Sequence, residues 1–136
     1  MMTKPLIHVA AALIRNEFGQ IYVTQRLEGK DFANALEFPG GKVEIGETIE
    51  EALIRELEEE IGIKPLTMQL FEYFLFEYPS KVIEFHFYLI EEWINEPFGR
   101  EGQKGMWILQ SDLDAEKFPP ANQKLISRLL AETMTS

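Results

Sequence analysis

Two apolar, β-branched stretches near the start of the chain define the first predicted elements. Residues 6–15 and 20–26 have strand composition, and Asn16-Glu17-Phe18-Gly19 between them has turn chemistry, which predicts a β-hairpin. Residues 28–39 show no periodicity and lead into Phe38-Pro39-Gly40-Gly41, which is typical of a glycine-rich loop.

The pattern then changes from extended to helical and back. Thr48 followed by Glu51 fits a capping box, so a helix should begin there and end near Gly62. Residues 68–78 and 81–92 are rich in aromatic and β-branched side chains and are separated by a Pro-Ser turn, which predicts a second hairpin.

The last part of the chain predicts one strand and one helix. Residues 105–110 form the strand, and Pro119-Pro120 precedes a helix whose buried stripe would be Leu125, Ile126, Leu129 and Leu130. These elements indicate one α/β or α+β domain over residues 1–136, with a mixed sheet covered by helices.

Composition supports a single globular domain and excludes several kinds of chemistry. The chain has 136 residues, is 46% hydrophobic and contains no cysteine, so disulfides, thiolate zinc sites and cysteine nucleophiles are excluded. Its net charge of −10 argues against binding to duplex DNA or to anionic membranes.

The uncharged run over residues 5–14 is too short to span a bilayer, which takes about 20 residues. Lys4 and three consecutive alanines also resemble part of a signal peptide. Because the run continues directly into Arg15-Asn16-Glu17, we expect a buried strand and a cytoplasmic protein.

The predicted helix carries an unusual concentration of acidic side chains. Residues 47–60 contain seven glutamates and one basic residue, Arg55, for a net charge of −6. Glu56, Glu59 and Glu60 share a helix face, whose mean direction is about 120° from that of the apolar stripe. That stripe comprises Leu53, Ile54, Leu57 and Ile61.

Such a carboxylate face is either solvated or holds a cation. Mg²⁺ prefers oxygen ligands and shares its coordination shell with substrate phosphates. Three features favour the cation: Glu47 precedes the helix, Arg55 can orient carboxylates, and Gly40-Gly41 permits close backbone approach. A Ca²⁺-binding structural protein is a weaker alternative, because EF-hand spacing is missing.

The spacing of these residues resembles a complete Nudix box. Gly41 is followed after five residues by Glu47, and after seven more by the stretch from Arg55 to Ile63, which reads RELEEEIGI. The resemblance implies a mixed β-sheet sandwiched between helices. It also implies hydrolysis of nucleoside diphosphates linked to another group, with Mg²⁺ or Mn²⁺.

Further stretches resemble the MutT-type branch of this family, which hydrolyses 8-oxo-dGTP to the monophosphate and pyrophosphate. They are LEFPGGK at residues 36–42, EGQ at 101–103 and FPPAN at 118–122. The resemblance implies that Arg26 and Asn122 contact the oxidised purine. Tyr78 and Lys81 stand where it leads us to expect Phe and Arg.

The same resemblance assigns the other candidate residues. The metal ligands would be Glu56, Glu59, Glu60, Glu101 and the Gly41 carbonyl. Glu56 is our first choice as general base and Glu101 the second, while Glu47 and Arg55 would orient the cluster. The substrate-binding residues would be Arg26, Glu37, Phe38, Lys42, Tyr78 and Asn122.

Several of these residues also have a purely structural interpretation. Asn122 after two prolines is a good helix N-cap, although its amide also suits the donor and acceptor of an oxidised purine edge. Arg26 and Lys42 can be solvated charges, and Phe38 can be core. His8 and His86 are far apart in the sequence, and we expect half-buried strand histidines without a catalytic role.

The sequence therefore predicts a monomeric enzyme that acts on a small-molecule nucleotide and binds neither duplex nucleic acid nor membrane. A Nudix hydrolase with another substrate is the main alternative: an unmodified nucleoside triphosphate, a dinucleoside polyphosphate or ADP-ribose. A non-catalytic Nudix-fold binding module is less favoured, because all the box carboxylates are present.

Overall fold

A four-stranded mixed sheet forms the centre of the molecule. The structure is a computed structural model that describes residues 3–29 and 32–134. The strand order is β4-β1-β7-β6, with β1 and β7 parallel and the other neighbours antiparallel. These strands are β1 (Leu6–Ile14), β4 (Gly40–Lys42), β6 (Gln69–Glu77) and β7 (Val82–Ile90).

Two smaller sheets complete the strand arrangement. The three-stranded sheet has the order β3-β2-β9, and the two-stranded sheet pairs β5 with β8. Their members are β2 (Gln20–Gln25), β3 (Leu36–Glu37), β5 (Lys64–Pro65), β8 (Trp93–Ile94) and β9 (Gly105–Leu109). Three short 3₁₀ helices follow β9: η1 (Gln110–Asp112), η2 (Ala115–Lys117) and η3 (Pro120–Asn122).

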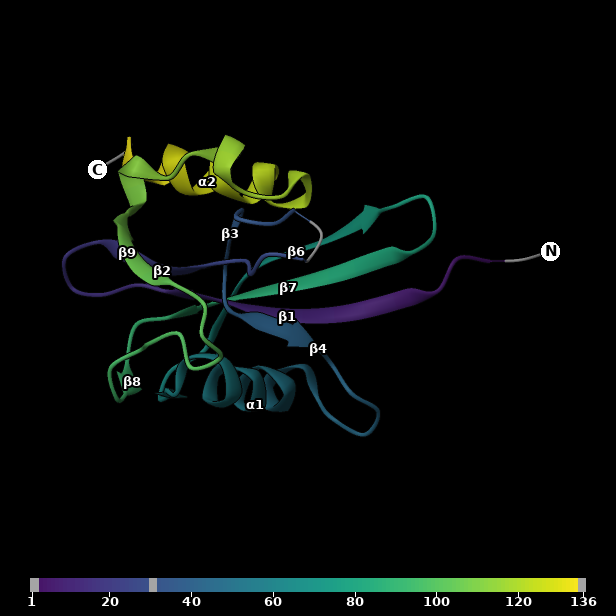
Figure 1. Cartoon of the computed structure of the whole chain (residues 1–136), viewed down its shortest axis with the longest axis horizontal. Helices are drawn as coiled ribbons and strands as arrows, with labels where there is room; N and C mark the ends of the chain where they lie inside the picture. Colours follow the sequence, from purple (N-terminus) through teal and green to yellow (C-terminus); the bar gives the residue numbers. More distant parts are fainter. Residues whose placement is uncertain (1–2, 30–31, 135–136) are drawn as a thin grey trace.

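The two α-helices lie on opposite sides of the sheet strands, as Figure 1 shows for α1 (Ile49–Ile61) and α2 (Gln123–Thr133). Each helix closes its own hydrophobic core. Leu53, Leu57 and Ile61 of α1 pack in one core with Ala10, Ala12 and Ile14 of β1. Leu125, Ile126 and Leu129 of α2 pack in the other with Ala11 and Leu13. The predicted mixed sheet between helices is therefore confirmed.

Capping determines where α1 begins and ends. The Glu51 amide donates to Thr48 Oγ1 at 3.1 Å, and the Thr48 amide donates to Glu51 Oε1 at 2.9 Å. At the other end, Gly62 adopts a left-handed conformation with a φ of 68°, which glycine tolerates without a Cβ penalty. Both boundaries agree with the sequence prediction.

The predicted hairpin between residues 6–15 and 20–26 is wrong. Strands β1 and β2 belong to different sheets, and one bridge, between Arg15 and Ile21, pairs their ends. The reason is that both edges of β1 have other partners: β7 pairs with it along its whole length, in nine register pairs, and β4 pairs with residues 9–11 on the opposite edge. The second predicted hairpin is confirmed, because β6 and β7 are antiparallel neighbours.

Three further details correct the predicted pattern. The segment over residues 28–39, expected to be irregular, contains the two-residue strand β3. Within it, Lys30 and Asp31 lie outside the described residues. The expected loop at Gly40-Gly41 begins β4. Ile54 is 42% exposed and does not belong to the buried stripe of α1.

The predicted strand over residues 5–14 is confirmed, with Ala10 to Ile14 buried.

No helix within residues 3–29 and 32–134 has both the length and the apolar character needed to cross a bilayer.

Candidate active site

The carboxylates of α1 lie against the glycine pair that begins β4. The Gly40 amide donates a hydrogen bond to Glu60 Oε2 at 3.0 Å. A Cβ placed on Gly41 would lie 2.5 Å from Glu56 Cδ and 2.6 Å from its Oε1. Any side chain at Gly41 would therefore occupy the space that the Glu56 carboxylate needs, which explains why glycine stands there.

Arg55 holds the carboxylates of two segments in fixed positions. Its Nε donates to Glu47 Oε2 at 2.7 Å and its Nη2 to Glu47 Oε1 at 3.0 Å, a two-pronged ion pair. Its Nη1 donates to Glu56 Oε1 at 2.9 Å and to Glu59 Oε2 at 3.4 Å. Because Nη2 also reaches the Lys42 carbonyl at 3.1 Å, the guanidinium ties the β4–α1 connection to the helix.

The cluster concentrates negative charge in a partly buried place. Burial raises the pKa of Glu60 to about 8, with added repulsion from Glu56, Glu37 and Glu101 and partial relief from the Gly40 amide. Burial also raises the pKa of Glu56, although Arg55 opposes this. A cation placed among these carboxylates would relieve the repulsion, so the donor set fits an oxygen-seeking divalent metal ion.

A loop before β9 brings Glu101 to the same place. The Arg100 amide donates to the Glu60 carbonyl at 2.9 Å, and Gln103 Nε2 donates to that carbonyl at 3.2 Å. Gln103 Oε1 in turn accepts from the Glu101 amide at 2.9 Å. The exposed Glu101 is close enough to contribute to the raised pKa values of Glu56 and Glu60, so the loop adds a carboxylate from outside the helix.

A pocket of about 680 Å³ opens beside the carboxylate cluster. It brings together five of the six predicted substrate-binding residues, and Lys42 lies outside it with an exposed side chain. Its lining includes Arg26, Glu37, Phe38, Tyr78 and Asn122, with Gly40 and Gly41 at one side. The two glycines therefore border both the pocket and the glutamates of α1.

The polar and aromatic groups of the pocket are held by specific contacts. Arg26 Nη1 donates to Glu37 Oε2 at 2.7 Å. Phe38 is only 7% exposed and stacks on Phe118 with ring centroids 5.0 Å apart, so it is both a core residue and a pocket wall. Burial raises the pKa of Tyr78, and the nearby positive charge of Arg26 opposes the rise.

Asn122 occupies the N-cap position of α2 but does not cap the helix. Its side chain makes no capping hydrogen bond, and the residue is buried at 9% exposure in the pocket wall. The sequence alone favoured a purely structural role for Asn122 as an N-cap. The geometry does not support that role.

Most of the chain matches a known protein family. Residues 5–129 match the NUDIX domain family. The chain belongs to the NUDIX family. The predicted family resemblance is thereby confirmed, and members of this family generally act with a divalent metal ion.

Two curated relatives and one solved structure align over most of this NUDIX chain. The 8-oxo-dGTP diphosphatase of Haemophilus influenzae is 69% identical over 97% of each chain. The 8-oxo-dGTP diphosphatase of Escherichia coli K12 is 47% identical over 90% of this chain and 95% of its own. A solved structure described as MutT from Aliivibrio salmonicida and Vibrio cholerae is 39% identical, with a TM-score of 0.80 over 93% of this chain and 98% of that one.

Sequence reasoning assigned no role to two residues in this NUDIX site. Gln103 fastens the loop that carries Glu101 to the end of α1, and Phe118 backs the pocket wall at Phe38. Both lie in stretches that carry the MutT-type resemblance, which is the signal that marks them. Their contacts join segments that are far apart in the chain, so only the structure reveals them.

Proposed function

We propose that this chain hydrolyses oxidised purine nucleoside triphosphates, chiefly 8-oxo-dGTP to 8-oxo-dGMP and pyrophosphate, and so keeps oxidised guanine out of DNA. One observation carries the proposal: Gly40 and Gly41 border the pocket on one side and the carboxylates of Glu56 and Glu60 on the other. A purine in the pocket can thus extend its phosphates to the acidic cluster. The activity named for relatives at 69% and 47% identity supports the same substrate.

The pocket offers suitable groups for the oxidised base. Oxidation at C8 turns N7 of guanine into a donor beside the O6 acceptor, and an asparagine amide has both an acceptor and a donor to match them. Asn122 and Arg26 line the pocket and supply these groups, while the Phe38 ring offers an apolar surface to the base.

We assign the cation to Glu56, Glu59, Glu60, Glu101 and the Gly41 carbonyl, and expect Mg²⁺ with Mn²⁺ as a substitute. A bound divalent ion would offset the phosphate charge and make a water molecule more acidic. Glu47 and Arg55 act on this cluster indirectly, since Arg55 fixes the Glu56 carboxylate through Nη1 while Glu47 fixes Arg55.

Hydrolysis requires a water molecule to attack phosphorus. By analogy with MutT-type enzymes we place the attack at the β-phosphorus, which breaks its bond to the oxygen shared with the α-phosphate. The nucleoside monophosphate then leaves and pyrophosphate forms. Glu56 is our choice for the proton acceptor because its carboxylate is held by Arg55 and lies against Gly41, whereas Glu101 is exposed on a loop.

A substrate panel tests the choice of nucleotide. Hydrolysis of 8-oxo-dGTP, dGTP, ATP, a dinucleoside polyphosphate and ADP-ribose is followed by chromatography of the nucleotide products, each with and without Mg²⁺, and pyrophosphate release is also measured for the nucleoside triphosphates. We expect kcat/KM to be highest for 8-oxo-dGTP and to depend on the metal. Equal values for 8-oxo-dGTP and dGTP would overturn the assignment and favour a Nudix hydrolase of another preference.

A matched pair of variants tests the acidic cluster. Glu56→Gln should lower kcat by orders of magnitude and leave the unfolding transition in place, because the amide can neither ligate a cation well nor accept a proton. Glu50→Gln makes the same change at an exposed position in the first turn of α1 and should keep normal activity. Near-normal turnover of Glu56→Gln would overturn the assignment of the metal ion and of the proton acceptor to Glu56.

We further propose that the enzyme works as a monomer and as one domain over residues 1–136, acting on free nucleotides and not on duplex nucleic acid. The nucleotide pool that such an enzyme serves lies in the cytoplasm, where we place it.

A further inference from the structure

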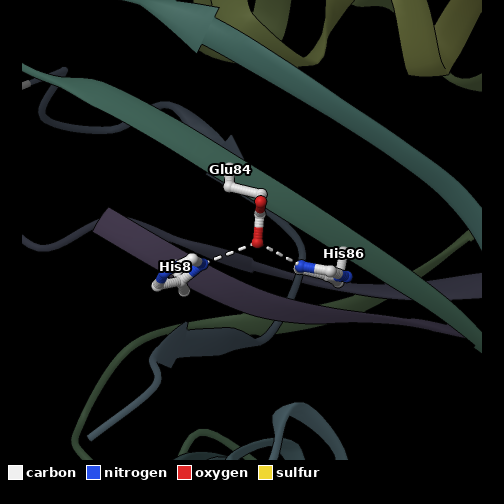
Figure 2. Close-up of side chains that lie close together, drawn as sticks. All are labelled: His8, Glu84 and His86. Atoms are coloured by element: carbon white, nitrogen blue, oxygen red, sulfur yellow. Dashed lines mark hydrogen bonds and ion pairs between the residues drawn. The ribbon is translucent and has the colours of Figure 1, made fainter. Parts of the chain in front are cut away.

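Two histidines and a glutamate meet on the sheet, away from the acidic cluster of α1. His8 lies on β1, and Glu84 and His86 lie on β7. In the parallel register His8 stands opposite Glu84 and Ala10 opposite His86, so the three side chains share one face of the sheet. Figure 2 shows both imidazole rings turned toward the carboxylate between them.

The two rings contact one carboxylate oxygen. His8 Nδ1 lies 2.6 Å from Glu84 Oε1, and His86 Nε2 lies 2.7 Å from the same atom. The other oxygen, Oε2, accepts a hydrogen bond from the Tyr73 hydroxyl at 2.9 Å, which fixes the orientation of the carboxylate. The Tyr73 ring also packs edge-on against His86, with centroids 4.9 Å apart.

This donor set differs in kind from that of α1. Two imidazoles and one carboxylate form a known set of three protein ligands for Zn²⁺, with water in the fourth coordination position. Mg²⁺, in contrast, prefers oxygen ligands alone. The three ligand atoms all lie within 4.8 Å of one another, the one such group of three among residues 3–29 and 32–134. Tyr73 provides the outer hydrogen bond that ligating carboxylates commonly receive.

A small movement would admit an ion. Ligand bonds of about 2.0–2.1 Å around a tetrahedral ion place neighbouring ligand atoms about 3.3 Å apart, so each contact would have to open by less than about 1 Å. The His8 side chain is 45% exposed and can make this adjustment, while Glu84 and His86 are 16% and 14% exposed and form the fixed part.

We propose that His8 Nδ1, Glu84 Oε1 and His86 Nε2 bind a transition-metal ion of the Zn²⁺ class, separately from the divalent metal of the Nudix glutamates. The ion would join β1 to β7, the only parallel pair in the four-stranded sheet. Val9, Ile83 and Phe85, which alternate with these ligands along the two strands, line the nucleotide pocket. The proposed site is thus on the reverse of the pocket floor and does not depend on the proposed substrate.

Zn²⁺ titration in excess Mg²⁺ tests the proposal, using protein without a histidine tag. The chain has two histidines, so ¹⁵N-imidazole NMR reports on each ring directly. We expect one equivalent of Zn²⁺ to shift His8 Nδ1 and His86 Nε2 selectively. Failure of either ring to respond at one equivalent would overturn the proposal.

Variants separate this site from the acidic cluster. Losing a hydrogen-bonding partner of a metal ligand typically weakens metal binding by roughly 10–100-fold. His8→Ala removes a ligand itself, one that is half-exposed, and should weaken Zn²⁺ binding by more than this. Tyr73→Phe removes such a partner and should fall within that range. Glu56→Gln should leave Zn²⁺ binding unchanged. Loss of the Zn²⁺ signal in Glu56→Gln, or its retention in His8→Ala, would place the ion elsewhere and refute the site.

Discussion

Asn122 is the residue on which the proposed discrimination between oxidised and normal purines depends most. It starts α2 without capping it, and its side chain contributes to the pocket wall beside Phe38. Phe38 lies between β3 and β4 and Asn122 ends η3, so the pocket joins segments more than 80 residues apart in the chain.

We expect Asn122→Ala to lower kcat/KM for 8-oxo-dGTP by roughly ten- to a hundredfold, since an unpaired buried polar group costs about 1–3 kcal/mol. Hydrolysis of dGTP should be largely kept. Steady-state kinetics with both nucleotides measure the ratio. Gln123→Ala, a change at the exposed neighbour, serves as the control. An equal fall for both nucleotides would instead indicate damage to the start of α2.

Residue identities in the acidic cluster were predictable because the signal is local. Glu56, Glu59 and Glu60 lie within one and a half turns of a helix; Arg55 contacts the first two, and the Gly40 amide bonds the third. His8 and Glu84 were not predictable as a pair. They are 76 residues apart, and only the parallel register of β1 and β7 makes them neighbours.

At the scale of elements, the connection between β4 and α1 depends on an ion pair. Hydrogen bonds from Arg55 and from the Glu44 amide lower the pKa of Glu47 to about 2, below the ordinary value of 4.5 for a glutamate. A carboxyl group whose pKa is lowered by folding stabilises the folded state above its unfolded pKa. This contribution is lost as the pH falls from about 4.5 through about 2.

Glu47→Gln should therefore destabilise the protein near neutral pH, and the difference from wild type should shrink as the pH falls between about 4.5 and 2. Urea unfolding at a series of pH values measures this difference. Glu50→Gln lies on the same helix but outside the Arg55 contacts, and it controls for the loss of one charge. A difference that stays constant with pH would contradict the ion-pair explanation.

Elements with local boundaries were predicted well, and those defined by distant partners were not. The capping residues of α1 and the turn between β6 and β7 are encoded in adjacent residues. Strands β5 and β8 have only two residues each, which is too few to show a period. The incorrect hairpin of β1 and β2 arose because turn residues mark a change of direction but do not determine which strand becomes the partner.

At the scale of the whole molecule, the net charge of −10 has a specific location. Residues 47–60 account for −6 of it, and the structure gathers part of that charge between α1, β4 and the loop of Glu101. A bound divalent cation would reduce the repulsion of polyanions at the place where phosphates would enter.

Under the proposed assignment Mg²⁺ should stabilise the fold, because it would bind the assembled cluster and not the unfolded chain. At about a hundred times its Kd, a ligand of the folded state adds about 2.7 kcal/mol to the free energy of unfolding. Urea unfolding with Mg²⁺ and with a chelator measures the gain, which should be smaller in Glu56→Gln. A gain of the same size in that variant would place the ion outside the cluster.

The parallel pairing of β1 with β7 has a consequence for synthesis on the ribosome. Residues 6–14 pair with residues 82–90, so β1 cannot complete its ladder until Ile90 has emerged. At about 5–20 residues per second, the wait is on the order of 4–15 seconds. During this time only the three-residue strand β4 is available to cover an edge of β1. The nascent chain therefore has an early, apolar strand without its main partner, and the appearance of β7 should time the folding of the domain.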